Sequence, residues 1–488
     1  MTSHRGTPTG AETRILVHGF GEHAVLYDHM IAMAAREAPH LTFAMLLPTT
    51  HHLGVIRQHV PDERILCLET ALRRVPLPVD DLAMLAGYSG SIHADIEAEK
   101  RTFKFRPAAF QMARAVEIYQ LYKDFVLRFR PHHVLFAHVE SYEQKMLESL
   151  CHELGIPVSV PTDLRTLGGS FMAPDTQETL PERPEPTPEH LARAADLVAR
   201  FRKAHLSALN FPIPEAERGA ALPLHTPPLP ARVAGFARRV VRHPDQFEWD
   251  FLRSAVLNNV PPLRDAWWAL KTRRAERYHD TPRLEDLPAK FIYYPLHLTP
   301  ESSINTPAPY YVDQFRVIDA IRMAMPSDHF LVVKEHYASI MVRPPRFMRE
   351  LQKRSGVRII HFRTPGREVI KRAALTISVT GTSTLEAFML GKPALTLGAM
   401  FMSPYYGGIT RLSDLPDRIR HAIAHPPADD DIIRSIAEVM AIGKPFTTFH
   451  LNQPGNPSQT ENHIRALLAA VRAEAETRSK SWQPAEHV

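Results

Sequence analysis

Cysteine is scarce in this chain of 488 residues. Only two cysteines occur, Cys67 and Cys151, and both lie within apolar runs. Two such residues cannot build a disulfide framework, which excludes the small disulfide-rich secreted proteins and is typical of proteins from a reducing cytoplasm. No spacing of cysteine and histidine matches that of a structural zinc site. We therefore expect a cytoplasmic protein that binds no metal.

Long apolar runs are also missing. The sequence has no stretch of about 18 uncharged apolar residues, so no segment is expected to span a membrane. Residues 1–20 hold no hydrophobic signal region before a small-residue cleavage site, so secretion is not expected. The hydrophobic fraction of 44% is enough for well-packed cores, and the length predicts two or three domains.

The excess charge is small, but it is concentrated in one segment. The net charge is only +5, and residues 231–279 alone hold ten basic and five acidic residues together with Trp249, Trp267 and Trp268. Such a segment is either a solvated helix face whose aromatic side chains pack in a core, or a peripheral contact with the anionic inner membrane surface. Nucleic acid is not an expected partner, because no nucleic-acid-binding motif accompanies the charge.

Strand and helix patterns alternate in two separate parts of the chain. This alternation predicts, in each part, a parallel sheet covered by helices, and such sheets bind ligands beyond the carboxyl ends of their strands. A proline-rich stretch and the basic segment separate the two parts. We predict an N-terminal Rossmann-like domain over residues 12–182, a linker and helical insertion over 183–285, a C-terminal Rossmann-like domain over 286–445, and a C-terminal helix with a polar tail over 446–488.

The segment 375–398, LTISVTGTSTLEAFMLGKPALTLG, has the pattern of an anion-binding turn. It predicts a buried strand, a turn rich in hydroxyl groups, a short helix and a second strand. The N–H groups of a first helical turn have no intrahelical partners, and the helix dipole adds positive potential there. Gly381 lets a ligand approach the backbone, and Glu386 can cap the helix or accept from ribose hydroxyls. The hydroxyl groups either bind the phosphate of a nucleotide or sugar phosphate or only cap the helix. They belong to Thr380, Thr382, Ser383 and Thr384.

Further loops that follow predicted strands hold candidate acids, bases and cleft residues. The loop HGFGEH, residues 18–23, lacks the third glycine of a dinucleotide-binding fingerprint. The predicted cleft loops contain His18, Gly19, Gly21, Glu301 and Ser302. Carboxylates at such positions can act as a general base or as a nucleophile. The candidates for that role are Glu22, Glu140 and Asp163, and a purely structural role stays open for each.

Four stretches of the chain resemble the capsule polysaccharide biosynthesis and export family. In the C-terminal half they are FIYYPLHLTPESSINTPAPYYVDQFRVIDAIRMAMPSDHFLVVKEH and VIKRAALTISVTGTSTLEAFMLGKPALTLG. In the N-terminal half they are RPHHVLFAHVESYEQKMLESLCHELGIPV and TDLRTLGGSFMAPDTQETLP. The resemblance implies a GT-B-like fold, with two Rossmann-like domains and a helical insertion between them. It places the nucleotide sugar in the C-terminal domain and the acceptor beside the N-terminal domain, and it implies no metal.

The resemblance also extends to a basic element after the strand FLVV. Relatives commonly carry Lys-x-His-Pro there, whereas this chain reads Lys334, Glu335, His336 and Tyr337, without the proline. The resemblance assigns Lys334 and His336 to the donor site. A cation at that position neutralises the donor phosphate as the glycosidic bond breaks. The structural alternative is that Lys334 pairs with a nearby carboxylate and that His336 is a surface residue.

The function implied by the resemblance is transfer of a sugar in bacterial capsule or surface polysaccharide assembly. The leading donor is a CMP-activated sugar such as Kdo, the acceptor is a glycan or glycolipid, and no other cofactor is required. Two other functions stay open. One is a sugar-nucleotide epimerase or polyol-phosphate transferase of similar build, and the other is a non-catalytic factor for polysaccharide export or binding.

Overall fold

In the computed structural model of the chain, the described residues are 12–79, 82–98, 106–137, 141–182, 184–203, 261–281, 283–299, 302–336, 339–340, 343–409, 411–448 and 460–478. The predicted site residues Glu140 and Glu301 lie outside the described residues. Most of the basic segment 231–279, with Trp249, lies outside them as well. Within the described ranges, no helix is both long and apolar enough to cross a membrane.

The first domain is built on a six-stranded sheet in the order β3-β2-β1-β4-β5-β6. All neighbours pair in parallel except β5 and β6, which are antiparallel. Most residues of these strands are buried, including several polar ones, as expected for a sheet with both faces covered. The strands are β1 (Thr13–His18), β2 (Leu41–Leu47), β3 (Ile65–Cys67), β4 (His133–Leu135), β5 (Val158–Asp163) and β6 (Ser170–Ala173).

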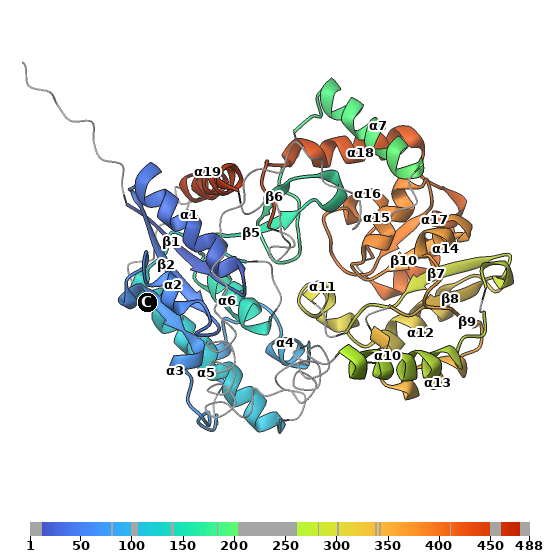
Figure 1. Ribbon diagram of the computed structural model, residues 1–488, viewed down its shortest axis with the longest axis horizontal. Coiled ribbons are helices and arrows are strands. Elements are labelled where there is room, and N and C mark those ends of the chain that lie inside the picture. The colour runs from blue at the N-terminus through green and yellow to red at the C-terminus, as the bar shows by residue number, and fades with distance from the viewer. Residues whose placement is uncertain are drawn as a thin grey trace, which may run out of the picture.

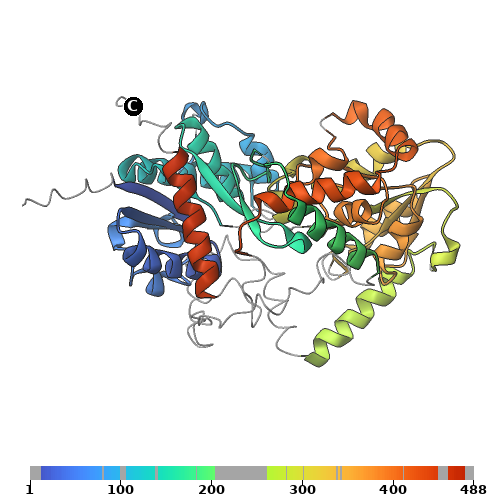
Figure 2. The same cartoon turned by 90° about the horizontal axis from the view of Figure 1, so that it is seen from above.

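Alternate residues of β1 face opposite sides of this sheet. Ile15 and Val17 pack in a core with α1 and α19, whereas Leu16 packs on the other side with α5 and α6. The C-terminal helix α19 lies beside α1 against the first domain (Figures 1 and 2), although it is the last element of the chain. These helices are α1 (His23–Glu37), α5 (Ala108–Phe129), α6 (Tyr142–Glu153) and α19 (Glu461–Arg478).

The second domain is built on a five-stranded sheet in the order β11-β10-β7-β8-β9, and all its pairs are parallel. One face packs on α12 and α17, and the other packs on α14 and α15. The strands are β7 (Phe291–Pro295), β8 (Phe330–Lys334), β9 (Val357–Ile360), β10 (Leu375–Ser378) and β11 (Ala394–Thr396). The helices are α12 (Gln314–Ala324), α14 (Gly366–Arg372), α15 (Thr382–Met389) and α17 (Leu415–Ala424).

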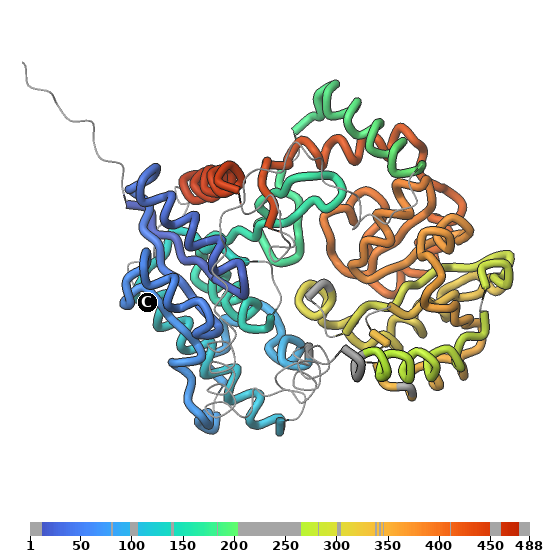
Figure 3. The backbone as a smooth tube through the Cα atoms, viewed as in Figure 1, coloured from blue at the N-terminus to red at the C-terminus, as the bar shows by residue number. Residues whose placement is uncertain are grey.

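The two sheets have the same topology. In each, the first strand along the chain is central, the next two strands lie on one side of it, and the later strands lie on the other side. This confirms the predicted α/β class with two Rossmann-like domains, and Figure 3 lets the reader follow the chain through them from blue to red. The exact domain boundaries stay a prediction. The remaining helices of four or more residues are α2 (Leu53–Ile56), α3 (Leu68–Ala71), α4 (Ile92–Ala98), α7 (Pro188–Lys203), α10 (Pro261–Glu276), α11 (Ser302–Asn305), α13 (Pro345–Gln352), α16 (Ser403–Tyr406) and α18 (Asp429–Ile442).

Two segments that are far apart in the sequence run side by side where the chain passes between the domains. Ser170 of β6 and Lys444 after α18 exchange two backbone hydrogen bonds, of 3.1 and 2.7 Å. Gly169 adopts a φ of +74°, and a Cβ atom there would lie 2.5 Å from the Lys444 carbonyl oxygen. Only glycine therefore allows this close approach.

Helix α7 lies within the predicted linker region but packs on the second domain. It contacts α18 and α15, and Figure 2 shows α7 and α18 side by side. The buried Phe201 ring lies 4.4 Å from the guanidinium of Arg367, which also donates to the carbonyls of Phe201 and Arg202 at 2.6 and 3.1 Å. Arg202 makes two hydrogen bonds with Asp429, of 2.6 and 2.9 Å. A cation–π contact and charge-assisted hydrogen bonds thus attach α7 to the second domain.

We expect Phe201→Ala to destabilise the chain by about 3–5 kcal/mol, because it empties a fully buried site and removes the ring under Arg367. The free energy of unfolding can be measured by urea titration followed by circular dichroism. The control is Arg200→Ala in the same helix, whose ion pair with Asp196 is exposed and should change stability by less than about 0.5 kcal/mol. Equal stability of the two variants would contradict the role given to Phe201.

Candidate functional site

The second sheet has its topological switch point between β7 and β10. The chain leaves β7 to form β8 and β9 on one side, then returns to form β10 and β11 on the other. The loops that follow β7 and β10 therefore diverge, and ligands of such sheets bind in the crevice between these loops. His297 joins the two loops, because its Nε2 lies 3.0 Å from Ser378 Oγ and accepts from the backbone N–H of Val379 at 3.2 Å.

His297 is a buried, neutral imidazole. Burial, together with the nearby charges of His336 and Arg343, lowers its pKa to about 3. Because Nε2 accepts from the Val379 N–H, the hydrogen-bond pattern assigns the ring proton to Nδ1. The backbone N–H of His297 donates to Gln314 Oε1 at 3.2 Å, which also accepts from the Tyr294 hydroxyl at 2.8 Å. These bonds fix the start of the loop after β7.

The turn after β10 brings the predicted hydroxyl residues to the start of α15. The Gly381 N–H donates to Ser378 Oγ at 3.0 Å, and a Cβ atom on Gly381 would lie only 2.5 Å from that oxygen. Thr382 and Ser383 occupy the first turn of α15, where backbone N–H groups have no intrahelical partner. Ser383 Oγ is buried and has no hydrogen-bond partner within the described part of the chain. These features provide donors at the switch point.

The other predicted residues of this turn are deeply placed. Thr380 is buried, and the Thr384 hydroxyl donates to the Gly381 carbonyl at 2.9 Å and lies 3.1 Å from the Tyr406 hydroxyl. Glu386 is also buried, in electrostatic contact with Arg367. Thr384 thus closes the turn from within the domain, whereas Thr382 and Ser383 lie at its partly exposed edge.

Lys334 ends β8, the strand on the other side of β7. Burial lowers the pKa of Lys334, and the charge of Glu335 partly opposes this shift. The structure records no hydrogen bond or ion pair for the Lys334 ammonium among the described residues. Glu335 is 2% exposed and its carboxylate pairs instead with Arg343 at 2.6 Å. The exposed His336 follows at the edge of the strand, where its N–H donates to Glu335 Oε1 at 2.8 Å.

Arg343 connects the ends of β7 and β8. Besides its ion pair with Glu335, its Nη2 donates to the His297 carbonyl at 2.6 Å, and its guanidinium lies 4.5 Å from the Phe347 ring. Sequence reasoning missed both Arg343 and His297. His297 carried a signal, since it follows the apolar strand pattern directly, whereas nothing in the sequence links Arg343 to that loop.

The first sheet has its switch point between β1 and β4, and it is also occupied by a buried histidine. His18 ends β1 with no exposed surface, stacks on Phe136 at 6.2 Å and lies 3.3 Å through Nδ1 from Gln144 Nε2 of α6. Burial lowers the pKa of His18 to about 3. Its Nε2 is buried without a hydrogen-bond partner in the described ranges. The predicted neighbours Gly19 and Gly21 form the turn into α1, and Gly21 adopts a φ of +52°.

Glu22 begins α1, and the structure brings His51 and His52 to it from the loop after β2. One carboxylate oxygen and one nitrogen from each ring all lie within 4.8 Å of one another. Of the described residues, this group alone has the composition and spacing of a metal site. Sequence reasoning expected no metal and missed the His51–His52 pair, whose position after a strand adjacent to β1 was the available signal.

The remaining predicted residues are placed as follows. Asp163 ends β5 and accepts from the Arg165 N–H in its own loop at 2.6 Å. Its other oxygen accepts from the Thr447 hydroxyl and so joins the two crossing segments. Ser302 begins α11, and its side chain is not described. Glu140 and Glu301 lie outside the described residues.

A cavity of about 720 Å³ lies between the segment after β6 and the loop after β11. This volume is typical of sites for small organic ligands. Arg165 lies over the Phe401 ring at 5.5 Å, and Phe171 meets the same ring edge-on at 6.2 Å, so the two domains touch there. The lining residues are Gln177, Glu178, Thr179, Leu180, Pro181, Glu182, Ala399, Met400, Phe401, Ser403, Pro404 and Gly408.

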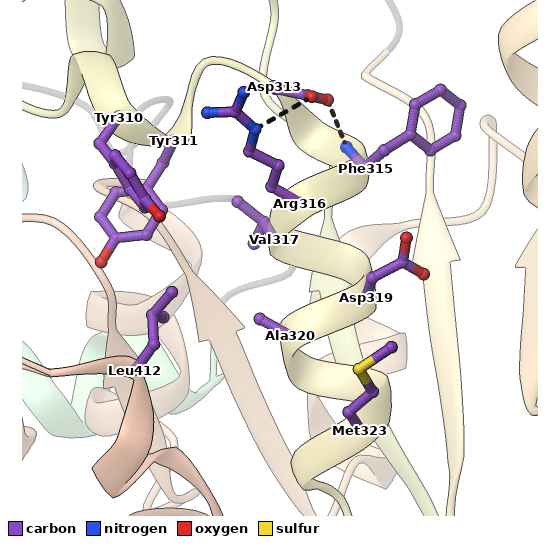
Figure 4. A pocket seen from close by; sticks show the side chains of 10 residues that line it. All are labelled: Tyr310, Tyr311, Asp313, Phe315, Arg316, Val317, Asp319, Ala320, Met323 and Leu412. Atoms are coloured by element: carbon purple, nitrogen blue, oxygen red, sulfur yellow. Dashed lines mark hydrogen bonds and ion pairs between the residues drawn. The ribbon is translucent and has the colours of Figure 1, made fainter.

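A second cavity, of about 470 Å³, lies along α12 (Figure 4). Tyr310 and Tyr311 face the helix across it, and Asp313 caps the helix by accepting from the Phe315 N–H at 3.0 Å. Asp313 also pairs with Arg316 at 3.5 Å. None of the predicted site residues lines this cavity, so we place the candidate site at the switch point and not here.

Comparison with family models and with curated proteins finds no match to the chain. Among solved structures, the UDP-GlcNAc 2-epimerase from Neisseria meningitidis bound to UDP-GlcNAc is 11% identical, covering 94% of this chain and 100% of that one with a TM-score of 0.23. The Thermosulfurimonas dismutans KpsC beta Kdo 2,4 transferase is 12% identical, covering 69% and 87% with a TM-score of 0.32. The beta Kdo 2,7 transferase of the same organism is 14% identical, covering 78% and 97% with a TM-score of 0.31. Likeness at this level identifies no substrate or reaction for this chain.

We expect Gly381→Ala to disturb the switch point, because the added Cβ would push Ser378 Oγ away from both the Gly381 N–H and His297. Overpacking of this kind costs about 1–3 kcal/mol, which thermal or urea unfolding can detect. The control is Gly54→Ala, where a Cβ atom meets nothing within 4 Å and φ is not positive. The explanation is wrong if Gly381→Ala is as stable as the control.

Proposed function

We propose that the chain is a nucleotide-sugar-dependent glycosyltransferase of bacterial surface polysaccharide assembly. In this proposal the second domain binds the donor at its switch point, and the first domain faces a glycan or glycolipid acceptor. The favoured donor is a CMP-activated sugar such as Kdo, which rests on the sequence resemblance. The observation that carries the proposal is Lys334, a half-buried cation at the carboxyl edge of the sheet without an ion-pair partner in the described chain.

Removing a charge from water is costly unless the charge is paired, so a half-buried ammonium that meets no carboxylate among the described residues suits an anionic ligand. The neighbouring carboxylate of Glu335 does not pair with the Lys334 ammonium, because it forms an ion pair with Arg343, whose Nε lies 2.6 Å from Glu335 Oε2. Arg343 thereby leaves the charge of Lys334 available to a ligand. A donor phosphate is the anion that matches the position, since such sheets bind phosphates beyond the carboxyl ends of their strands.

The start of α15 supplies the second group of donors. Gly381 keeps the turn open, and the first-turn N–H groups with the positive end of the helix dipole favour an anion. The strand order places the ends of β10, β7 and β8 next to one another. A diphosphate or phosphodiester between α15 and Lys334 would therefore meet fixed donors from both sides. Charge that develops on the leaving phosphate in the transition state is stabilised by such preorganised groups.

The acceptor side needs a base or a nucleophile, for which Glu22 and Glu140 stay the candidates. Asp163 is the weakest of the three, because the Arg165 N–H and the Thr447 hydroxyl already occupy its oxygens. His18 cannot serve as a base in the observed arrangement, since it is fully buried beneath the loop after β1. Its neutral ring instead supports that loop, as His297 does in the second domain.

We expect CMP to bind the wild-type chain and Lys334→Ala to weaken this binding roughly 10- to 100-fold, the loss typical of one charged hydrogen-bond donor. Titration calorimetry with CMP, CDP, UDP and GDP measures the affinities. The control is Lys290→Ala, which removes an exposed cation paired with Asp328 at the opposite edge of the sheet and should leave binding unchanged. Selective binding of UDP would favour an epimerase or another transferase, and failure of every nucleotide would favour an export or binding factor.

The affinity for CMP should also depend on pH. Burial lowers the pKa of Lys334, so this residue loses its proton at a lower pH than an ordinary lysine. Only the charged form attracts phosphate, so affinity should be full below that lowered pKa and fall as the pH rises through it. Lys334→Arg should keep its affinity at high pH, because arginine stays charged. Calorimetry from about pH 7 to about pH 10 tests this, and equal pH profiles of the two proteins would contradict it.

A further inference from the structure

Two loops leave the carboxyl edge of the first sheet side by side. Strands β1 and β2 are parallel neighbours, and His18 at the end of β1 pairs in register with Leu46 near the end of β2. The loop after β1 leads to Glu22, and the loop after β2 leads to His51 and His52. The topology therefore brings one carboxylate and two imidazoles together from two different loops.

We propose that Glu22, His51 and His52 bind a divalent transition-metal ion, with Zn²⁺ as the ion that this set fits best. Two imidazole nitrogens and one carboxylate oxygen are a ligand set for zinc that leaves a fourth position open to water or another oxygen ligand. Bonds of about 2.0–2.1 Å would place tetrahedral ligands about 3.3 Å apart. The observed ligand atoms lie within 4.8 Å of one another, so small side-chain rotations close the site.

An ion pair between Glu22 and His52 explains the arrangement less well. Glu22 Oε1 lies 3.9 Å from His52 Nε2, which is too long for a hydrogen bond. The gap is instead close to the separation of two atoms that share one ion. His51 adds a third ligand atom at similar range, with its ring centroid 4.3 Å from that of His52. An ion pair has no need of this third residue.

The backbone around the three ligands is held in place before any ion binds. Glu69, a buried carboxylate, accepts from both the N–H and the hydroxyl of Thr50, at 2.7 and 2.9 Å, directly before the histidine pair. The His52 carbonyl accepts from the N–H groups of Val55 and Ile56 at the start of α2. The Glu22 carbonyl likewise accepts from the first N–H groups of α1. Outer contacts of this kind orient the ligands of metal sites and are themselves important for affinity.

The inference is independent of the proposed glycosyl transfer, because it concerns the first domain and can be measured without a nucleotide. It has one consequence for that proposal. A Glu22 carboxylate that coordinates an ion is not free to act as a base or nucleophile, which would leave Glu140 as the candidate for that role.

The test is binding of Co²⁺ and Zn²⁺ to the full chain after treatment with a chelator and removal of any affinity tag. Co²⁺ reports its coordination through visible absorption, and Zn²⁺ binding is measured by competition with the Co²⁺ signal. We expect one equivalent to bind with the spectrum of a four-coordinate ion. Glu22→Gln, His51→Ala and His52→Ala should each lower the affinity at least about 100-fold, and Glu69→Gln should lower it about 10-fold.

The matched control is His59→Ala, which removes a histidine that pairs with Asp28 at 3.0 Å in the same domain. It should bind metal as the wild type does, which separates the proposed site from weak binding to the 27 histidines of the chain. Circular dichroism of the metal-free proteins checks folding, and the exchange Glu22→Gln carries the test if a histidine variant does not fold. The proposal is overturned if the wild type binds no stoichiometric ion, or if the ligand variants bind as tightly as His59→Ala.

Discussion

The candidate site depends on a buried imidazole that joins the diverging loops of two neighbouring strands. A doubly wound sheet opens a crevice at its switch point, and the polar groups exposed inside that crevice must be satisfied. In the second domain His297 meets this constraint by contacting Ser378 and accepting from the Val379 N–H, and Ser378 in turn accepts from Gly381. In the first domain His18 lies at the equivalent place against Gln144. Because burial keeps both rings neutral, they hold the loops without adding charge where an anion is proposed to bind.

Much of the fold could be predicted from the sequence because the signals are local. The apolar run FIYYP correctly predicted β7, and the hydroxyl-rich turn around Gly381 correctly predicted the start of α15. Hydrophobic periodicity and turn chemistry act over only a few residues, so they can be recognised in the sequence. The roles of individual side chains were harder to predict. Arg343 reaches the carbonyl of His297 from 46 positions away, and Thr447 reaches Asp163 from 284 positions away. No spacing rule within one segment can anticipate such contacts.

The histidine pair His51–His52 was missed for the same reason, because its contact with Glu22 joins distant parts of the sequence. Metal motifs are recognised in sequences by short spacings, whereas Glu22 and His52 are joined only because β1 and β2 are neighbours in the sheet. Lys334 illustrates the opposite case. Its place at the end of an apolar strand indicated its position, but its lack of an ion-pair partner among the described residues depends on the ion pair of Glu335 with Arg343. A position could thus be read from the pattern, while the electrostatic environment required the packed structure.

The return of α19 to the first domain has a mechanical consequence. The chain connects the domains twice, and the reciprocal bonds between Ser170 and Lys444 hold the two connections against each other at one place. A single connecting segment allows one domain to rotate freely relative to the other. Two connecting segments that are hydrogen-bonded to each other limit that rotation. The two connections therefore restrict how the domains can move relative to each other more than one connection would, and the cavity beside Phe401 lies where the two domains touch.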